Sequence, residues 1–135
     1  MAEVSGAPAE RAASILAVDD SRDGLRLLAR LLSEQGFQVR PVLDGAAALA
    51  AAALEVPDLV LLDLQMPGMD GLMTIRHIRT HADPVVASTR IIAVTALAMA
   101  GDRERCLAAG ANEYISKPVN LKELKQMIES QLGKL

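Results

Sequence analysis

The chain has 135 residues, of which 51% are hydrophobic, and a formal net charge of -3 at pH 7. This length predicts one domain, and the lack of a basic stripe with interleaved aromatic residues argues against direct nucleic-acid binding. The single Cys106 excludes an internal disulfide and is expected to be a buried structural thiol. No apolar window approaches a membrane span and no signal peptide begins the chain, so we expect a cytoplasmic protein without membrane contact.

Strands and helices are predicted to alternate along the chain, after a mobile tail at residues 1–13 that precedes a domain at 14–135. Short apolar runs indicate the strands, and apolar residues at helical spacing with glycine stop signals indicate the helices. In chain order we predict strand 14–18, helix 25–32, strand 37–42, helix 45–54, strand 59–63, helix 72–78, strand 91–94, helix 99–109, strand 112–116 and helix 121–132. The connection 80–90 contains Asp83-Pro84 and is predicted to be a loop.

This strict alternation predicts an α/β fold with a parallel sheet and helices on both faces. Four of the predicted strands end in or lead into polar residues. Asp19-Asp20 follow the first strand, Asp63 ends the third, Thr95 ends the fourth and Lys117 follows the fifth. Because parallel strands point the same way, these side chains are expected to converge on one crevice at the carboxyl edge of the sheet.

The predicted crevice brings together three carboxylates, which repel one another. Two carboxylates about 4 Å apart repel by roughly 4 kcal/mol at an effective dielectric of 20. A cation relieves this repulsion, and an all-oxygen site with room for water suits Mg²⁺ or Mn²⁺ bridging to a phosphate. An ionised carboxylate is also a competent nucleophile toward a phosphoryl group. Lys117 and Thr95 would then contact the phosphoryl oxygens.

Each of these residues also has an ordinary structural explanation. An acid pair after a strand often forms a turn, and Asp20 or Ser21 could cap the following helix. Thr95 could reflect β-propensity alone, and Lys117-Pro118 could be a simple loop dipeptide. Their joint order and their placement at strand ends favour a shared site.

With these residues in place, the chain resembles the response-regulator receiver domain of two-component signalling. The resemblance covers about Ser14 to Leu132 and rests on an ordered set of motifs. These are Asp19-Asp20, Asp63 followed by Met66-Pro67-Gly68-Met69-Asp70-Gly71, Thr95-Ala96, and Tyr114-Ile115-Ser116-Lys117-Pro118. The resemblance implies a doubly wound, flavodoxin-like sheet of five strands in the order 2-1-3-4-5.

The resemblance also implies a metal site and a phosphorylation site. Asp63 would accept a phosphoryl group from a phosphohistidine on a histidine kinase or a histidine phosphotransfer protein. Mg²⁺ would be held by Asp20 and Asp63, by Asp19 through water, and by the backbone carbonyl of Gln65.

Other residues of the crevice would serve the switch. Thr95 and Lys117 would hold phosphoryl oxygens, small Ala96 would leave the site open, and Tyr114 would be the switch aromatic. The Lys117-Pro118 bond would be cis.

The family resemblance further implies a protein that catalyses only its own phosphorylation and dephosphorylation. Since no output domain follows the last predicted helix, we expect a stand-alone regulator that contacts a downstream protein target or relays the phosphoryl group onward. Leu97 offers no group to orient an attacking water, which predicts slow self-dephosphorylation, although Gln65 could partly offset this.

Two other functions stay open. A phosphohydrolase of the haloacid-dehalogenase type also uses a strand-end Asp with Mg²⁺, but its second acid lies two residues after the nucleophile, where this chain has Gln65. An interaction module with a dead site is the other alternative, and the complete acidic set argues against it. His77 and His81 are interpreted as solvated surface residues, not as phosphodonors or a metal pair.

Overall fold

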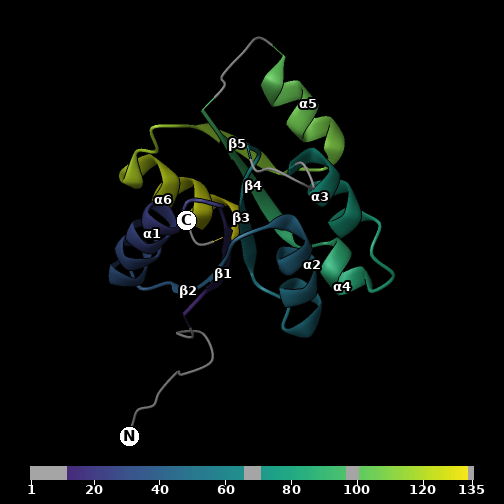
Figure 1. Cartoon of the computed structure of the whole chain (residues 1–135), viewed down its shortest axis with the longest axis horizontal. Coiled ribbons are helices and arrows are strands. Elements are labelled where there is room, and N and C mark those ends of the chain that lie inside the picture. Colours follow the sequence, from purple (N-terminus) through teal and green to yellow (C-terminus); the bar gives the residue numbers. More distant parts are fainter. Residues whose placement is uncertain (1–11, 66–70, 97–100, 134–135) are drawn as a thin grey trace, which may run out of the picture.

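A computed structural model describes residues 12–65, 71–96 and 101–133 of the chain (Figure 1). Strands and helices alternate as predicted, with one additional short helix. The elements are β1 (Ser14–Val18), α1 (Arg22–Glu34), β2 (Gln38–Val42), α2 (Gly45–Leu54), β3 (Leu59–Asp63), α3 (Gly71–Arg79), α4 (Pro84–Ala87), β4 (Arg90–Thr95), α5 (Asp102–Ala109), β5 (Glu113–Ser116) and α6 (Leu121–Gln131).

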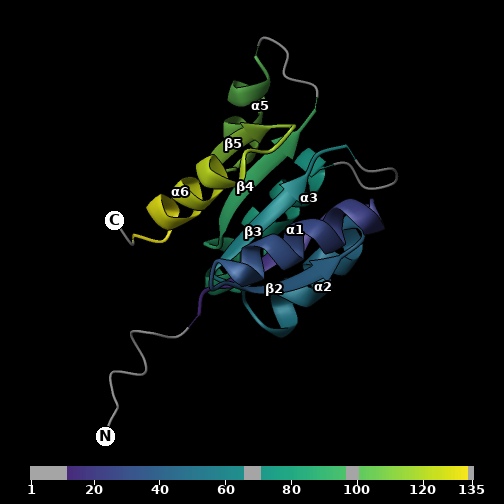
Figure 2. The ribbon, with the colours of Figure 1, turned by 90° about the vertical axis from the view of Figure 1, so that its left-hand side faces the viewer.

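The five strands form one parallel sheet in the order β2-β1-β3-β4-β5. This confirms the predicted doubly wound fold and its strand order. Helices α1 and α6 cover one face of the sheet, and α2, α3, α4 and α5 cover the other (Figures 1 and 2). The carboxyl ends of β1 and β3, which neighbour each other at the centre of the sheet, therefore meet at one edge.

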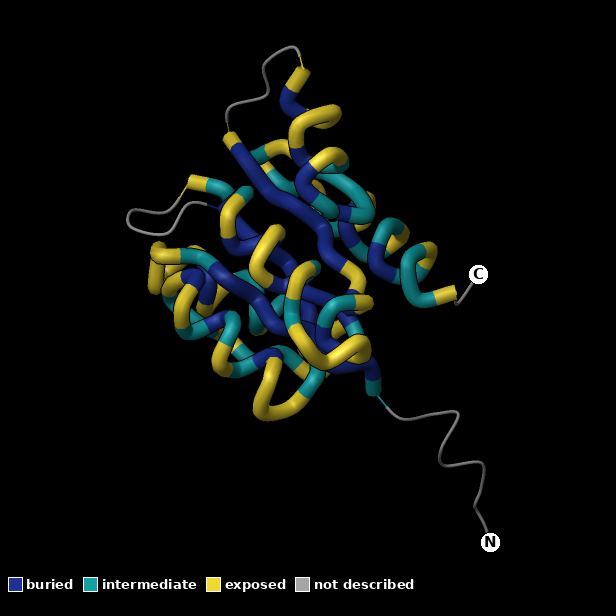
Figure 3. The backbone as a smooth tube through the Cα atoms, turned by 90° about the vertical axis from the view of Figure 1, so that its right-hand side faces the viewer, coloured by how far each residue is buried: buried dark blue, intermediate teal, exposed yellow. Residues whose placement is uncertain are grey.

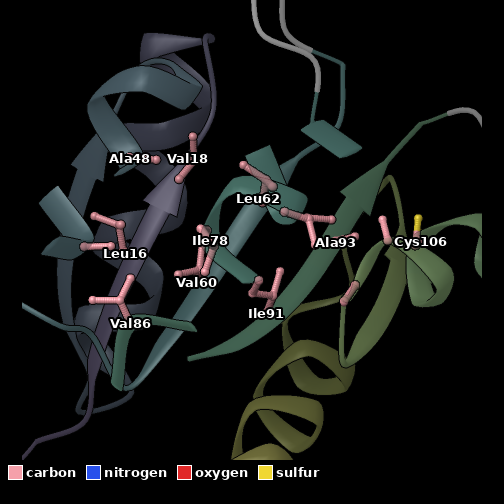
Figure 4. Close-up of a cluster of buried hydrophobic side chains, with 14 residues drawn as sticks. Leu16, Val18, Ala48, Val60, Leu62, Ile78, Val86, Ile91, Ala93 and Cys106 are labelled. Atoms are coloured by element: carbon pink, nitrogen blue, oxygen red, sulfur yellow. The ribbon is translucent and has the colours of Figure 1, made fainter. Parts of the chain in front are cut away.

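The core lies in two layers, one on each face of the sheet. Successive strand residues point to opposite faces, so Leu16 and Val18 pack under α2 to α5 (Figure 4) while Ile15 packs under α1 and α6. The central strands are buried on both faces (Figure 3). Burial on both faces explains why β3 reads as an unbroken apolar run and not as an alternating one.

The prediction of a loop throughout residues 80–90 was wrong, because α4 lies within it. Asp83 caps this helix by accepting a hydrogen bond from the backbone N–H of Val85 at 2.9 Å, and Pro84 occupies the first helical position. Both residues are typical of helix starts. A four-residue helix is too short to show an apolar period, which is why the sequence pattern missed it.

Two strands begin one residue later than predicted. The backbone N–H of Phe37 donates to the carbonyl of Leu32 and so closes α1, which leaves β2 to begin at Gln38. Asn112 precedes β5 because its side-chain oxygen accepts hydrogen bonds from Ile91 and Arg79.

Three elements extend beyond their predicted bounds, namely α1, α3 and β4, and further differences concern the chain ends and α5. The last helix ends at Gln131, with Leu132 as its cap. Of the predicted helix 99–109, the structure describes Asp102–Ala109, and residues 99–100 lie outside the described residues. Ala13 is buried and its carbonyl accepts a hydrogen bond from Gln38, whereas most of the predicted tail lies outside the described residues.

Cys106 is buried, as predicted, at 1% exposure. His77 is exposed on α3, and His81 follows that helix. None of the helices in the described ranges has both the length and the apolar character that a membrane crossing requires.

Candidate functional site

Three carboxylates meet at the carboxyl edge of the sheet, as the sequence predicted. Asp19 and Asp20 follow β1 and Asp63 ends β3, and each offers an oxygen atom within 4.8 Å of the others. Asp63 is buried at 4% exposure, Asp19 is half-buried and Asp20 is exposed. The cluster is therefore open to solvent on the Asp20 side and closed around Asp63.

The cap of helix α1 is Ser21 and not a residue of the Asp19-Asp20 pair. The Oγ atom of Ser21 accepts the backbone N–H of Gly24 at 3.3 Å and caps α1. Asp19 instead accepts the backbone N–H of Ser21 on its Oδ1 atom at 2.9 Å. This bond orients the Asp19 carboxylate at the start of α1, while Ser21 serves the helix.

Asp63 is held by one donor on each carboxylate oxygen. The backbone N–H of Gln65 donates to Oδ1 at 3.0 Å, and Lys117 Nζ donates to Oδ2 at 3.3 Å. Lys117 Nζ also lies 3.7 Å from Asp19 Oδ2. Burial raises the pKa of Asp63 and the Asp19 charge adds to this, while the Gln65 N–H and Lys117 act in the opposite direction.

The donor set fits a hard divalent cation. Among the described residues, the Lys117 ammonium group pairs with two of the three carboxylates, Asp19 and Asp63, which leaves an excess of negative charge when the acids are ionised. Clustered carboxylate oxygens are the ligands that Mg²⁺ and Mn²⁺ prefer. Asp19, Asp20 and Asp63 could therefore hold such an ion. The role of the Gln65 backbone carbonyl as a further metal ligand stays a prediction.

The predicted switch residues lie on β4 and β5 or directly follow these strands. Thr95 is 4% exposed, and its carbonyl accepts the backbone N–H of Lys117 at 2.8 Å, which ties the two strand ends together. Ala96 follows and is exposed. Tyr114 pairs with Ala93 across the strands and packs, half-buried, against the core under α2 to α5. The Lys117-Pro118 bond is cis, as predicted.

The side chain of Gln65 makes a contact that the sequence did not predict. Its Oε1 atom accepts the backbone N–H of Ala96 at 2.7 Å. The contact joins the loop after β3 to the loop after β4 across 31 residues of sequence. No local pattern signals it, because it exists only once the two strands are paired.

Close packing fixes the start of α3 against Leu64. A Cβ atom on Gly71 would lie 2.6 Å from the Cα atom of Leu64, which is nearer than real side chains approach. Gly71 starts α3, so its missing side chain lets this helix approach the residue that directly follows Asp63.

Two cavities flank the carboxylates. A groove of about 330 Å³ opens beside Asp63 and Lys117 and runs between α1 and α6. Its lining is largely apolar and includes Leu27, Leu28, Leu31, Leu121 and Leu124. A second cavity of about 240 Å³ lies at Gln65 and Thr95, against α3 and α5. The sequence analysis did not predict either cavity, since both are spaces between elements.

Comparison with known proteins places this chain in a family. Residues 15–129 match the family model of the response regulator receiver domain. The chain belongs to this family, whose members are receiver domains of two-component signalling.

Individual relatives agree with this assignment. The chain is 40% identical over 108 residues to the response regulator PleD of Caulobacter vibrioides, which covers 80% of this chain and 23% of PleD. It therefore spans less than a quarter of that relative. It is 34% identical to the polar-differentiation response regulator DivK of Brucella anthropi, covering 89% of this chain and 96% of DivK.

A solved structure resembles the fold of this chain. The receiver domain of a sensor histidine kinase from Pseudomonas aeruginosa is 34% identical, with a TM-score of 0.82, and covers 90% of this chain and 98% of that chain. That crystal structure has a magnesium ion coordinated in its active site cleft.

Proposed function

We propose that Asp63 accepts a phosphoryl group from a phosphohistidine on a histidine kinase or a histidine phosphotransfer protein. The observation that carries this proposal is the placement of a buried strand-end carboxylate within 3.3 Å of Lys117 and beside two further carboxylates. Family membership supports the same role.

The transfer needs a nucleophile and a leaving group. One oxygen of the Asp63 carboxylate attacks phosphorus, the P–N bond breaks, and the imidazole leaves with the bonding electron pair and takes up a proton from solvent. The product is an acyl phosphate on Asp63. Later attack by water on phosphorus breaks the new P–O bond and returns the carboxylate.

The surrounding side chains stabilise charge during this transfer. Lys117 moves its contact from the Asp63 carboxylate to a phosphoryl oxygen, and the Thr95 hydroxyl donates to another. Asp19, Asp20 and Asp63, with the Gln65 carbonyl, would hold Mg²⁺ or Mn²⁺, and the bound ion would supply positive charge that offsets negative charge on the phosphoryl oxygens. Burial raises the pKa of Asp63, and a bound cation would oppose this shift by favouring the ionised, nucleophilic carboxylate.

The output is a change of protein contact or an onward relay of the phosphoryl group. Thr95 and Tyr114 lie on the adjacent strands β4 and β5, so a movement of Thr95 toward the phosphoryl group opens space beside the half-buried ring of Tyr114. This movement would remodel α5 and β5 and present a changed surface to a downstream protein target.

The experiment is incubation of the chain with Mg²⁺ and a small phosphodonor, followed by mass spectrometry. We expect one phosphoryl adduct in the wild type and none in Asp63→Asn. Turnover of phosphate esters without an adduct would indicate a hydrolase instead. A wild-type chain that forms no adduct and turns nothing over would indicate a dead interaction module.

A further inference from the structure

The Gln65 side chain extends the pairing of β3 and β4 beyond the ends of both strands. Asp63 pairs with Val94, and the backbone N–H of Leu64 donates to the carbonyl of Val94 at 2.9 Å. One step further, the donor is the N–H of Ala96 and the acceptor is the amide oxygen of Gln65, at 2.7 Å. A side chain thus supplies the acceptor that a backbone carbonyl supplies in a regular ladder.

This hydrogen bond between Ala96 and Gln65 is connected to the proposed phosphorylation site. Gln65 binds the Asp63 carboxylate with its backbone N–H and binds Ala96 with its side chain. The Ala96 N–H is therefore linked to the Asp63 carboxylate through a single residue, Gln65. A phosphoryl group brings three strong acceptor oxygens, and the N–H of Ala96 is already engaged.

We propose that Gln65 is a positioning residue that holds Ala96, the residue after β4, in its unphosphorylated arrangement by occupying the Ala96 N–H. A phosphoryl group on Asp63 competes for this N–H, and its arrival releases the Gln65 amide. The inference rests on the proposed function of Asp63 and concerns the equilibrium between the two arrangements. Gln65 thereby sets how readily the site accepts a phosphoryl group.

The exposure of the contact limits the size of the effect. Gln65 and Ala96 are both exposed, so water can replace each partner when the bond breaks. The net contribution of one such hydrogen bond corresponds to roughly a two- to tenfold change in an equilibrium constant.

Two substitutions separate the acceptor from the bulk of the side chain. Gln65→Met keeps the length and the unbranched shape but removes the acceptor oxygen, so it opens the contact. Gln65→Glu keeps an acceptor at the same position and retains the contact. Gln126→Met is the matched control, because Gln126 is an exposed glutamine on α6.

The contact itself is measured by hydrogen exchange of the Ala96 amide in NMR spectra. We expect protection in the wild type, in Gln65→Glu and in Gln126→Met, and at least a twofold faster exchange in Gln65→Met. Equal exchange in the wild type and Gln65→Met would overturn the proposal.

The competition is measured by calorimetric titration with trifluoroberyllate, a non-hydrolysable phosphoryl mimic, in the presence of Mg²⁺. We expect Gln65→Met to bind the mimic two- to tenfold more tightly than the wild type, and Gln126→Met to bind it equally. Faster exchange without tighter binding would also overturn the proposal.

The same titration keeps this proposal distinct from the proposed function. A wild-type chain that does not bind the mimic and is not phosphorylated on Asp63 contradicts the proposed function, and with it the inference. A wild-type chain that binds the mimic with the affinity of Gln65→Met contradicts only the role of Gln65.

Discussion

Asp63 carries a buried carboxyl group, and burial disfavours the ionised form of such a group. Its carboxyl group is 4% exposed, and burial with the nearby Asp19 charge raises its pKa. An acid with a raised pKa in the folded state contributes stability that is full below its unfolded pKa of 3.8 and is lost as the pH rises through the folded pKa. As the pH rises through the folded pKa, ionisation of Asp63 therefore destabilises the metal-free protein.

This balance predicts the effect of Asp63→Asn on stability. We expect the variant to melt at a higher temperature than the wild type at pH 7 without metal, and the difference to vanish as the pH falls below 3.8. Mg²⁺ at ten times its Kd should stabilise the wild type by about 1.4 kcal/mol and the variant by less. Thermal melting across pH, with and without Mg²⁺, checks both statements, and equal melting curves at pH 7 would contradict them.

A second prediction at this scale concerns Leu97, which lies outside the described residues. A leucine side chain neither donates nor accepts a hydrogen bond, so it cannot orient water toward an acyl phosphate. We expect the phosphoryl group on Asp63 to have a lifetime much longer than seconds after the donor is removed. Leu97→Asn should shorten this lifetime. Mass spectrometry over a time course measures both chains. A phosphoryl lifetime of seconds in the wild type would contradict the prediction of slow self-dephosphorylation.

At the scale of elements, Arg79 joins four segments at the end of the sheet opposite the carboxylates. Its guanidinium donates to the carbonyls of Ala87, Thr89 and Gly110 at 2.6–2.8 Å and to the side chain of Asn112 at 2.8 Å. Gly110 has a φ of 121°, and a Cβ atom there would lie 2.6 Å from Arg79 Cγ. The α5 turn therefore needs glycine for both its backbone and its packing.

We predict that Arg79→Met destabilises the protein by about 2–4 kcal/mol, because charged hydrogen bonds are lost and carbonyl groups lose their donor. Arg76→Met is the control, since Arg76 is exposed on the same helix and its substitution should stay within about 0.5 kcal/mol. Urea unfolding measures both variants. An Arg79→Met chain as stable as Arg76→Met would show that the network contributes nothing.

At the scale of the whole molecule, the apolar groove between α1 and α6 leads to the proposed phosphorylation site. Asp63 and Lys117 form part of its lining, and Leu27 stands at its edge at 58% exposure. Exposed arginines recur every four residues on α1, at Arg22, Arg26 and Arg30. A phosphohistidine helix that reaches Asp63 from this side would bury Leu27.

This placement predicts that Leu27→Asp slows phosphotransfer from a histidine kinase or phosphotransfer protein about tenfold or more, since burying one leucine contributes about 1.5–3 kcal/mol. Phosphorylation by a small donor should be unchanged. Leu54→Asp is the control, because Leu54 is 88% exposed on α2, a helix on the opposite face of the sheet. Equal effects of the two substitutions on transfer would contradict the proposed approach.

The sequence by itself determined the alternation of strands and helices and the residues at the strand ends. Apolar runs and stop glycines are local signals, and strand direction in a parallel sheet follows from alternation. Asp19, Asp20 and Asp63 could therefore be assigned to one cluster, and the structure brings them together. The short helix α4 was missed because one turn shows no period.

Only the tertiary structure decided the contacts between segments that are distant in sequence. The Gln65 bond to Ala96, the hydrogen bonds of Arg79 and the groove at Leu27 all depend on how neighbouring elements pack. Side-chain reach and the space between helices are properties of the assembled layers, and no sequence period encodes them. The reactive side chains at the strand ends can thus be predicted from local sequence. The contacts that position them and the groove that leads to them depend on how the elements pack.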